Sequence, residues 1–174
     1  MKNVLILITL SLFLFAGCGD DDASPNNQNG SNAGNISFTL DGEDFNSELG
    51  VGGFFTDVAG VQTFLISGFR ELGISDLASI NFGFPTDQSV EETTYLFSNM
   101  NCDSTTEVCG VVSFIDDGVT FGSTNGTGVS VTVSSVDFQK GGHIRGTFSG
   151  TMTNADTGED VTLVNGSFDV PIVE

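Results

Sequence analysis

Apolar and polar residues alternate with a period of two through most of the chain after residue 35. This period places apolar side chains on one face of a β-strand, whereas an amphipathic helix repeats its apolar residues every three to four positions. Helical spacing is not sustained there over any useful length. The pattern predicts that residues 35–174 form one all-β globular domain, long enough to bury a core of its own.

The first expected hairpin carries the strongest turn signal. Residues 36–40 alternate apolar and polar, and Asp41-Gly42 then supplies the pair that a two-residue hairpin turn prefers, leading into a strand around Phe45. Further strands are expected at 52–58, 61–69, 78–84, 93–98 and 107–115.

The last third of the chain predicts a three-stranded antiparallel meander. Valines at 129, 131 and 133 share one parity, but Val136 and Phe138 share the other, so keeping one face requires an extra residue near Ser134-Ser135. This predicts a β-bulge. The strand around 144–152 follows, and the final strand changes parity at Asn165-Gly166.

About ten short strands joined by Gly, Asn and Asp turns predict an antiparallel β-sandwich or a flattened β-barrel. Fourteen phenylalanines follow residue 17 and the chain has no tryptophan, so phenylalanine must fill much of the core. An alternative use for so many rings is a Phe-lined cavity that carries a small apolar ligand.

The beginning of the chain has the layout of a secretory signal peptide over residues 1–17. Lys2 is followed by an apolar run from Val4 to Phe15 and by the small residues Ala16 and Gly17. The run is about twelve residues long, whereas a membrane-spanning helix needs about twenty.

Cys18, the residue after this leader, indicates a particular class of secreted protein. Phe15-Ala16-Gly17-Cys18 resembles the lipobox of bacterial lipoproteins, although Phe15 stands where that family usually has Leu. The resemblance implies that Cys18 receives a diacylglycerol, becomes the acylated N-terminus and carries palmitate-type chains. Two or more acyl chains give stable membrane attachment. Ordinary cleavage that leaves a free cysteine is the alternative.

The cluster Asp20-Asp21-Asp22 behind Cys18 resembles the surface-export signal of Bacteroidetes lipoproteins. It is also consistent with a solvated tether. Residues 23–34 are almost without apolar side chains, so they cannot bury enough surface to offset the entropy of ordering. Residues 18–34 are therefore expected to form a disordered acidic and polar tether.

The charge of the chain excludes one class of partner. Without residues 1–17, three basic residues remain against 23 acidic ones. Such a surface repels phosphate backbones, so nucleic-acid binding is excluded. The acidic side chains are expected to keep the protein soluble. The alternative is that they recruit divalent cations.

Cys102 and Cys109 are expected to form a disulfide, because an oxidising compartment favours pairing of the two cysteines that remain. In this prediction the bond joins the strands 93–98 and 107–115 across the loop of a hairpin. A metal site would need further Cys or His ligands, and the chain has only His143.

Candidate chemistry is sparse, and the expectation is that the protein is not an enzyme. His143 lies beside a Gly-Gly turn without a nucleophile motif such as G-x-S-x-G. Calcium is the one cofactor that the residues suggest, since Asp156, Glu159 and Asp160 gather in one loop, although their spacing does not match an EF-hand.

Three stretches resemble small secreted Bacteroidetes lipoproteins with an uncharacterised β-rich domain. Gly146–Thr151 contains the "GTF" strand of that family, Gly166–Val170 contains its "G-x-F" strand, and Phe38–Gly42 is similar to its first hairpin. The resemblance implies a lipid-anchored, all-β protein of the outer membrane that faces the cell surface. It implies no reaction.

The resulting expectation is an extracytoplasmic lipoprotein with a non-enzymatic binding or structural domain. Its partners would be the membrane, through the lipid anchor, and an unknown protein or glycan. The alternatives are the Phe-lined carrier, a surface module that binds calcium or carbohydrate, and a hydrolase that uses an adjacent carboxylate pair: Glu91-Glu92, Asp116-Asp117 or Glu159-Asp160.

Overall fold

The computed structural model describes residues 34–47, 49–58, 61–70, 76–84, 89–97, 108–123, 128–139 and 141–173. Within these ranges the regular structure consists of eleven strands, which form one antiparallel sheet curled into a half-barrel. The all-β prediction is confirmed. The strands are β1 (Asn35–Leu40), β2 (Glu43–Asn46), β3 (Leu49–Val58), β4 (Val61–Phe69), β5 (Leu77–Phe84), β6 (Thr94–Phe97), β7 (Cys109–Asp116), β8 (Val119–Gly122), β9 (Val129–Val136), β10 (His143–Asn154) and β11 (Asp160–Pro171).

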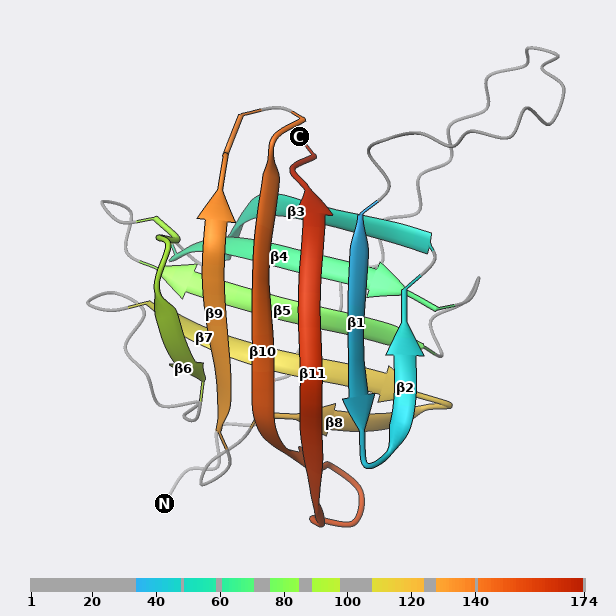
Figure 1. The fold of residues 1–174 in the computed structure, drawn as a ribbon. Helices are drawn as coiled ribbons and strands as arrows, with labels where there is room; N and C mark the ends of the chain where they lie inside the picture. The colour runs from blue at the N-terminus through green and yellow to red at the C-terminus, as the bar shows by residue number, and fades with distance from the viewer. Residues whose placement is uncertain are drawn as a thin grey trace, which may run out of the picture.

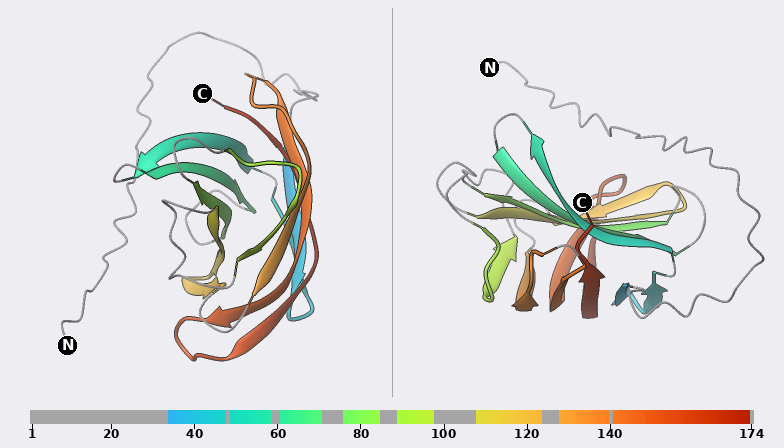
Figure 2. Two further views of the ribbon diagram at one scale, coloured as in Figure 1. Left: turned by 90° about the vertical axis from the view of Figure 1, so that its left-hand side faces the viewer. Right: turned by 90° about the horizontal axis from the view of Figure 1, so that it is seen from above.

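The sheet has two halves whose strands cross at a large angle (Figure 1). One half contains β2, β1, β11, β10, β9 and β6, and the other contains β8, β7, β5, β4 and β3. Strand β10 joins them, because it pairs with β9 over Ile144–Gly150 and with β8 at Thr153 and Asn154. Figure 2 shows the first half curving around the second.

The two halves also meet at the end of the chain. An isolated parallel bridge joins Gly53 of β3 to Ile172, and the Val173 amide donates a hydrogen bond of 2.8 Å to the Gly53 carbonyl. The ring of Phe64 would lie only 2.7 Å from a Cβ at position 53. Glycine at position 53 therefore leaves room for the Phe64 ring of the neighbouring strand β4.

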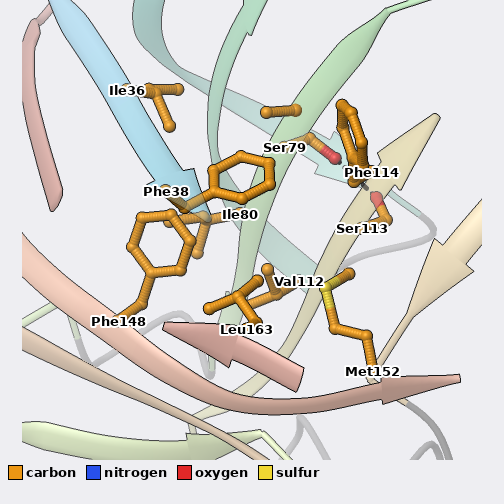
Figure 3. Close-up of a pocket in the computed structure, with 11 residues that line it drawn as sticks. Ile36, Phe38, Ser79, Ile80, Val112, Ser113, Phe114, Phe148, Met152 and Leu163 are labelled. Carbon is orange, nitrogen blue, oxygen red and sulfur yellow. Dashed lines mark hydrogen bonds between the residues drawn. The ribbon is translucent and has the colours of Figure 1, made fainter. Parts of the chain in front are cut away.

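The core lies between the halves and is filled. Its largest fully buried side chains include Phe64, Phe82, Phe84, Ile36, Ile66 and Ile80. A cavity among Phe38, Phe148, Met152 and their neighbours measures about 10 Å³, which is no more than one water molecule occupies (Figure 3). The interior at this level has no room for an apolar ligand.

The predicted turn and both parity changes are confirmed. Asp41 and Gly42 have φ angles of 49° and 89°, as a primed hairpin turn between β1 and β2 requires. Strands β9 and β10 shift register at the first parity change. Ser135 pairs with Arg145 and Val133 pairs with Gly146, so Ser134 is the extra residue of the bulge. The shift in β11 lies at Asn165, whose φ is 56°. The meander β9–β10–β11 follows.

The expected hairpin around the cysteine loop is wrong. Strand β6 pairs with β9, whereas β7 pairs with β5 and β8, so β6 and β7 belong to different halves of the sheet. They approach through side chains, because the Phe97 ring occupies the space beside Gly110 in which a Cβ would lie. Packing of this ring across the core therefore replaces pairing within the sheet.

Strand β8 is an element that the sequence analysis missed. It follows a second Asp-Gly turn, in which Asp117 and Gly118 have φ angles of 46° and 84°. This turn repeats the signal of Asp41-Gly42 and joins β7 to β8. The dipeptide therefore contained the information needed to predict the hairpin.

Several predicted features lie outside the described residues: the leader, Cys18, the acidic cluster Asp20, Asp21 and Asp22, and Cys102. Cys109 lies at the start of β7, and its pairing with Cys102 stays a prediction. Among the residues that are described, no helix is long and apolar enough to cross a membrane.

Candidate functional site

A pocket of about 390 Å³ lies where the β1–β2 hairpin faces the β7–β8 hairpin. The turns of both hairpins are at the lower right of Figure 1. We call this pocket the mouth pocket. The end of β4, the end of β10 and the start of β11 complete its wall. Its apolar lining consists of Phe38, Leu40, Phe45, Phe114, Phe121 and Val161.

Packed aromatic rings form the floor of the mouth pocket. Phe38 stacks on Phe45 with ring centroids 4.7 Å apart, and both rings meet Phe114 edge-on at 5.2 and 5.0 Å. These three side chains are buried, whereas Phe121 and Val161 are half-buried. The floor is therefore held rigidly by the core, and its outer members remain available to a ligand.

Carboxylates dominate the rim. The polar lining consists of Asp41, Glu43, Asp44, Asp116, Asn154 and Glu159, with Arg70 as the one cation among the described residues that line the pocket. Two of the carboxylates are positioned by hydroxyl groups: Thr39 Oγ1 donates to Asp44 Oδ1 at 2.7 Å, and Thr157 Oγ1 donates to Glu159 Oε2 at 3.4 Å.

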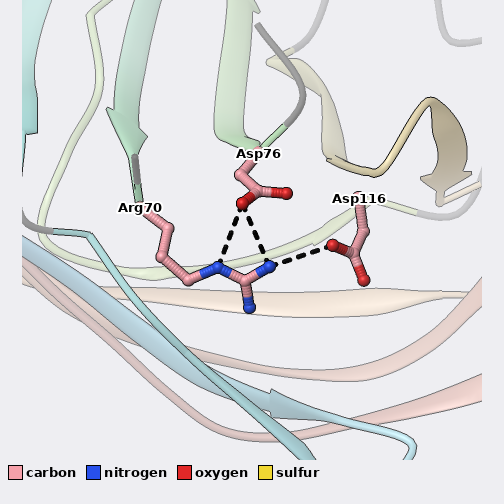
Figure 4. Close-up of polar contacts among 3 residues, drawn as sticks. All are labelled: Arg70, Asp76 and Asp116. Atoms are coloured by element: carbon pink, nitrogen blue, oxygen red, sulfur yellow. Dashed lines mark hydrogen bonds and ion pairs between the residues drawn. The ribbon is translucent and has the colours of Figure 1, made fainter. Parts of the chain in front are cut away.

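Arg70 is bound into a cluster at the inner wall (Figure 4). Its Nε and Nη2 both donate to Asp76 Oδ2 at 3.1 Å, and Nη2 also donates to Asp116 Oδ1 at 3.0 Å. The guanidinium carbon lies 5.9 Å from the Phe45 ring centroid, within the range of a cation–π contact. Arg70 is thus held by carboxylates and an aromatic ring before any ligand arrives.

Asp76 is the buried member of this Arg70 cluster. Its side chain is 8% exposed, and Oδ1 has no hydrogen-bond partner among the described residues. Burial raises the pKa of the Asp116 carboxyl, and the neighbouring Asp76 raises it further, while the charge of Arg70 only partly offsets both. One guanidinium therefore faces two carboxylates, and the cluster carries surplus negative charge.

A second charged cluster lies away from the mouth pocket. His143 Nδ1 lies 2.5 Å from Asp169 Oδ1, and Arg145 Nε donates to Asp169 Oδ2 at 2.8 Å. Burial opposes ionisation of Asp169, but hydrogen bonds from Arg145 and His143 outweigh it and lower the pKa of that carboxyl. This arrangement ties β10 to β11, since Arg145 and Asp169 are directly paired across the strands. The role it supports is structural.

The outer face of the first half carries a row of hydroxyl groups. Strand register aligns five of them on five neighbouring strands: Thr94, Thr132, Thr147, Ser167 and Ser37. We call this set the hydroxyl row. Its ends pair internally, at 2.9 Å between Thr94 and Thr132 and at 2.9 Å between Ser37 and Ser167. A shallow hollow of about 450 Å³ lies over the row's centre.

The acids proposed for calcium lie in the turn between β10 and β11. Asp156 and Glu159 are exposed, and the turn is organised by Asn154 Oδ1, which accepts hydrogen bonds from the amides of residues 156 and 157. Thr153 donates to Asp160 at 3.1 Å. Within the described ranges, no three His, Cys, Asp or Glu side chains are placed to hold one ion. Calcium binding stays a prediction.

Of the acidic residues proposed from sequence, Asp116 and Glu159 line the mouth pocket. The sequence analysis missed Arg70 and Asp76 and did not connect Asp116 with them, although one signal was present. Arg70 is one of only three basic residues after the leader and follows a predicted strand, which made it a candidate for an ion pair with an acidic partner. Nothing in the sequence identified that partner.

Comparison with models of known protein families, with curated proteins and with solved structures finds no match to this chain. The function therefore has to be argued from the geometry of this molecule.

Proposed function

We propose that the protein is a lipid-anchored, extracytoplasmic binding protein without enzymatic activity, and that the mouth pocket is its ligand site. The observation that carries the proposal is a contrast in volume: the interior cavity measures about 10 Å³, whereas the mouth pocket measures about 390 Å³. The larger volume lies within the usual range for sites that bind small molecules. An aromatic floor with a polar rim is also typical of such sites.

The arrangement favours binding over catalysis. His143 is paired with Asp169 at a distance from the mouth pocket, and Arg70 is paired with two carboxylates. A general base needs to reach a reacting group, and the carboxylates of the rim lie mostly on exposed turns. Recognition by shape, apolar contact and charge is what this pocket supports.

Filling the pocket tests the proposal. Val161 is half-buried in the pocket wall, so Val161→Trp should occupy the space that a ligand needs. Val164→Trp is the matched control, because Val164 lies on the same strand but is 39% exposed. A library of neutral and charged aromatic fragments is screened by amide NMR. We expect fragments to shift the amides of 41–44 and 116–121 in the native chain and in the control, but not in Val161→Trp.

Fragments that shift other regions, or that bind Val161→Trp unchanged, would reject the mouth pocket as the ligand site. Loss of binding in both tryptophan variants would point to a general disturbance of the fold and would also count against the assignment.

The anchor and the disulfide form a separate part of the proposal. Intact mass of membrane-extracted protein should show that residues 1–17 are absent, that acyl chains are attached at Cys18, and that two hydrogens are missing because Cys102 and Cys109 are joined. A soluble, unacylated product or a retained leader would contradict the anchor. An unchanged hydrogen count would contradict the disulfide alone.

The hydroxyl row supports a second candidate function, binding of a neutral glycan. It presents uncharged donors and acceptors across five strands on a strongly acidic protein. Thr147→Glu places a charge at its centre, and Thr162→Glu, on an exposed position outside the row, is the control. Retention on neutral polysaccharide resins should fall for the first variant only. No retention of the native chain would reject this candidate.

A further inference from the structure

The lining of the mouth pocket is unbalanced in charge. Among the described residues, five carboxylates line it, from Asp41, Glu43, Asp44, Asp116 and Glu159, against the single guanidinium of Arg70. That guanidinium already donates to Asp116 and to the buried Asp76. A negatively charged ligand would therefore meet repulsion at the rim and, at the wall, a cation that is already paired with two carboxylates.

The inner wall adds a specific feature to this acidic rim. Asp76 is more than nine-tenths buried, its Oδ1 lacks a partner among the described residues, and Figure 4 draws this oxygen on the side nearer Asp116. Two carboxylates with one guanidinium leave one surplus negative charge, and one of the two carboxylates, Asp76, is buried. A buried charge that is incompletely paired is costly, so a cation placed beside Asp116 would stabilise the cluster.

The floor sets the second requirement. Phe121 and Val161, which are half-buried, offer apolar surface that a hydrated inorganic ion would leave uncovered. A ligand that covers this floor gains from burying its own apolar area. The acidic rim therefore favours a ligand with a positively charged group, and the apolar floor favours an apolar group on the same ligand.

We infer that the mouth pocket binds a small organic cation that carries an apolar, preferably aromatic, body, with the charged group toward Asp116 and the apolar body on Phe121 and Val161. This inference rests on the proposed function, because it names the ligand class of the same site.

Three probes of similar size and different charge test the inference: 2-phenylethylammonium, 2-phenylethanol and 3-phenylpropionate. Each is titrated into the purified full chain at low salt and followed by amide NMR. We expect the ammonium probe to bind with a dissociation constant on the order of 1 mM. The alcohol should bind about fivefold more weakly, and the carboxylate should produce no shift in 41–44 or 116–121. Added salt should weaken the ammonium probe selectively.

A pair of double variants separates the pocket from the net charge. Glu43→Gln/Glu159→Gln neutralises two carboxylates of the rim, whereas Glu91→Gln/Glu92→Gln neutralises two exposed carboxylates before β6. The first should weaken the ammonium probe about fivefold and leave the alcohol unchanged. The second should leave both unchanged.

The outcomes distinguish an error in the ligand class from an error in the location of the site. If the alcohol or the carboxylate binds the pocket as well as the ammonium probe, the ligand class is wrong while the site stands. If none of the three shifts the pocket amides, the site and the ligand class both fail. If the two double variants weaken the ammonium probe equally, binding follows overall charge, and the inference is contradicted.

Discussion

Phenylalanine packs the interior of the half-barrel and also lines its mouth, but the two regions differ in how much space stays open. Between the two halves, phenylalanines pack with other apolar side chains, and the cavity among Phe38, Phe148 and Met152 measures about 10 Å³. At the mouth, Phe38, Phe45 and Phe114 pack as closely, yet about 390 Å³ remains open above them. The difference comes from what surrounds the rings.

Turn chemistry provides that difference. The β1–β2 and β7–β8 hairpins, which face each other across the mouth pocket, both turn through an Asp-Gly pair, at Asp41-Gly42 and at Asp117-Gly118. Asp41 of the first turn and Asp116, which directly precedes the second turn, line the pocket, and carboxylates resist burial against one another. The turns that form the hairpins thus also keep this end of the half-barrel open.

Removing one ring from each region gives the largest expected contrast. Phe148 is 3% exposed in the interior, so Phe148→Ala should lower the free energy of unfolding by about 3–5 kcal/mol. Phe121 is half-buried at the mouth, and Phe121→Ala should cost about 1–2 kcal/mol. Urea denaturation measures both. Equal losses would mean that the mouth is packed as tightly as the interior.

The Arg70 cluster should respond more strongly than an exposed ion pair. Arg70→Gln leaves the Asp76 carboxylate buried without its partner, and the partial exposure of Arg70 reduces the expected loss to about 1–3 kcal/mol. Adding Asp76→Asn should restore much of that loss. In Arg145→Gln, where both partners are about half exposed, the loss should be about 0–1 kcal/mol. Equal effects of the two arginine variants would remove the distinction between the clusters.

The two Asp-Gly turns should be equally sensitive to a side chain. Gly42 and Gly118 have positive φ angles, and a Cβ added at either position would meet no described atom within 4 Å beyond its chain neighbours. Alanine therefore costs only conformational strain, about 1–2 kcal/mol in each turn. Asparagine tolerates this conformation better and should recover part of the loss. Thermal unfolding of the four variants checks this, and a larger loss from asparagine than from alanine would contradict the turn assignment.

The smallest expected effects are in the pH dependence, and they have opposite signs. The lowered pKa of Asp169 means that its contribution to stability is present above the usual carboxyl pKa of 3.8 and is lost as pH falls through the folded-state value. The raised pKa of Asp116 means that stability falls as pH rises from 3.8 through the folded-state value. We expect Asp169→Asn to remove the first trend and Asp116→Asn the second.

Unfolding free energies measured in steps from about pH 2 to pH 6 follow both trends. Asp76→Asn should also weaken the Asp116 trend, because Asp76 is one of its causes. If Asp169→Asn and Asp116→Asn changed the pH dependence of the unfolding free energy in the same direction, the assigned environments of these carboxyl groups would be contradicted.

Local patterns in the sequence predicted the elements that depend on neighbours in the chain. Alternation identified the strands, and the parity changes located Ser134 and Asn165. The pairing of β6 could not be predicted in this way, because a strand of four residues does not encode its distant partner. The site was missed for the same reason: Arg70 and Asp116 are 46 residues apart and meet through the order of β4, β5 and β7.

Crystals soaked with 2-phenylethylammonium test the central claim most directly, because they compare the mouth with the interior in one experiment. We expect density for the aromatic ring on Phe121 and Val161, the ammonium group beside Asp116, and no density between the two halves of the sheet. Ligand found between the halves, or bound only on another face, would contradict it.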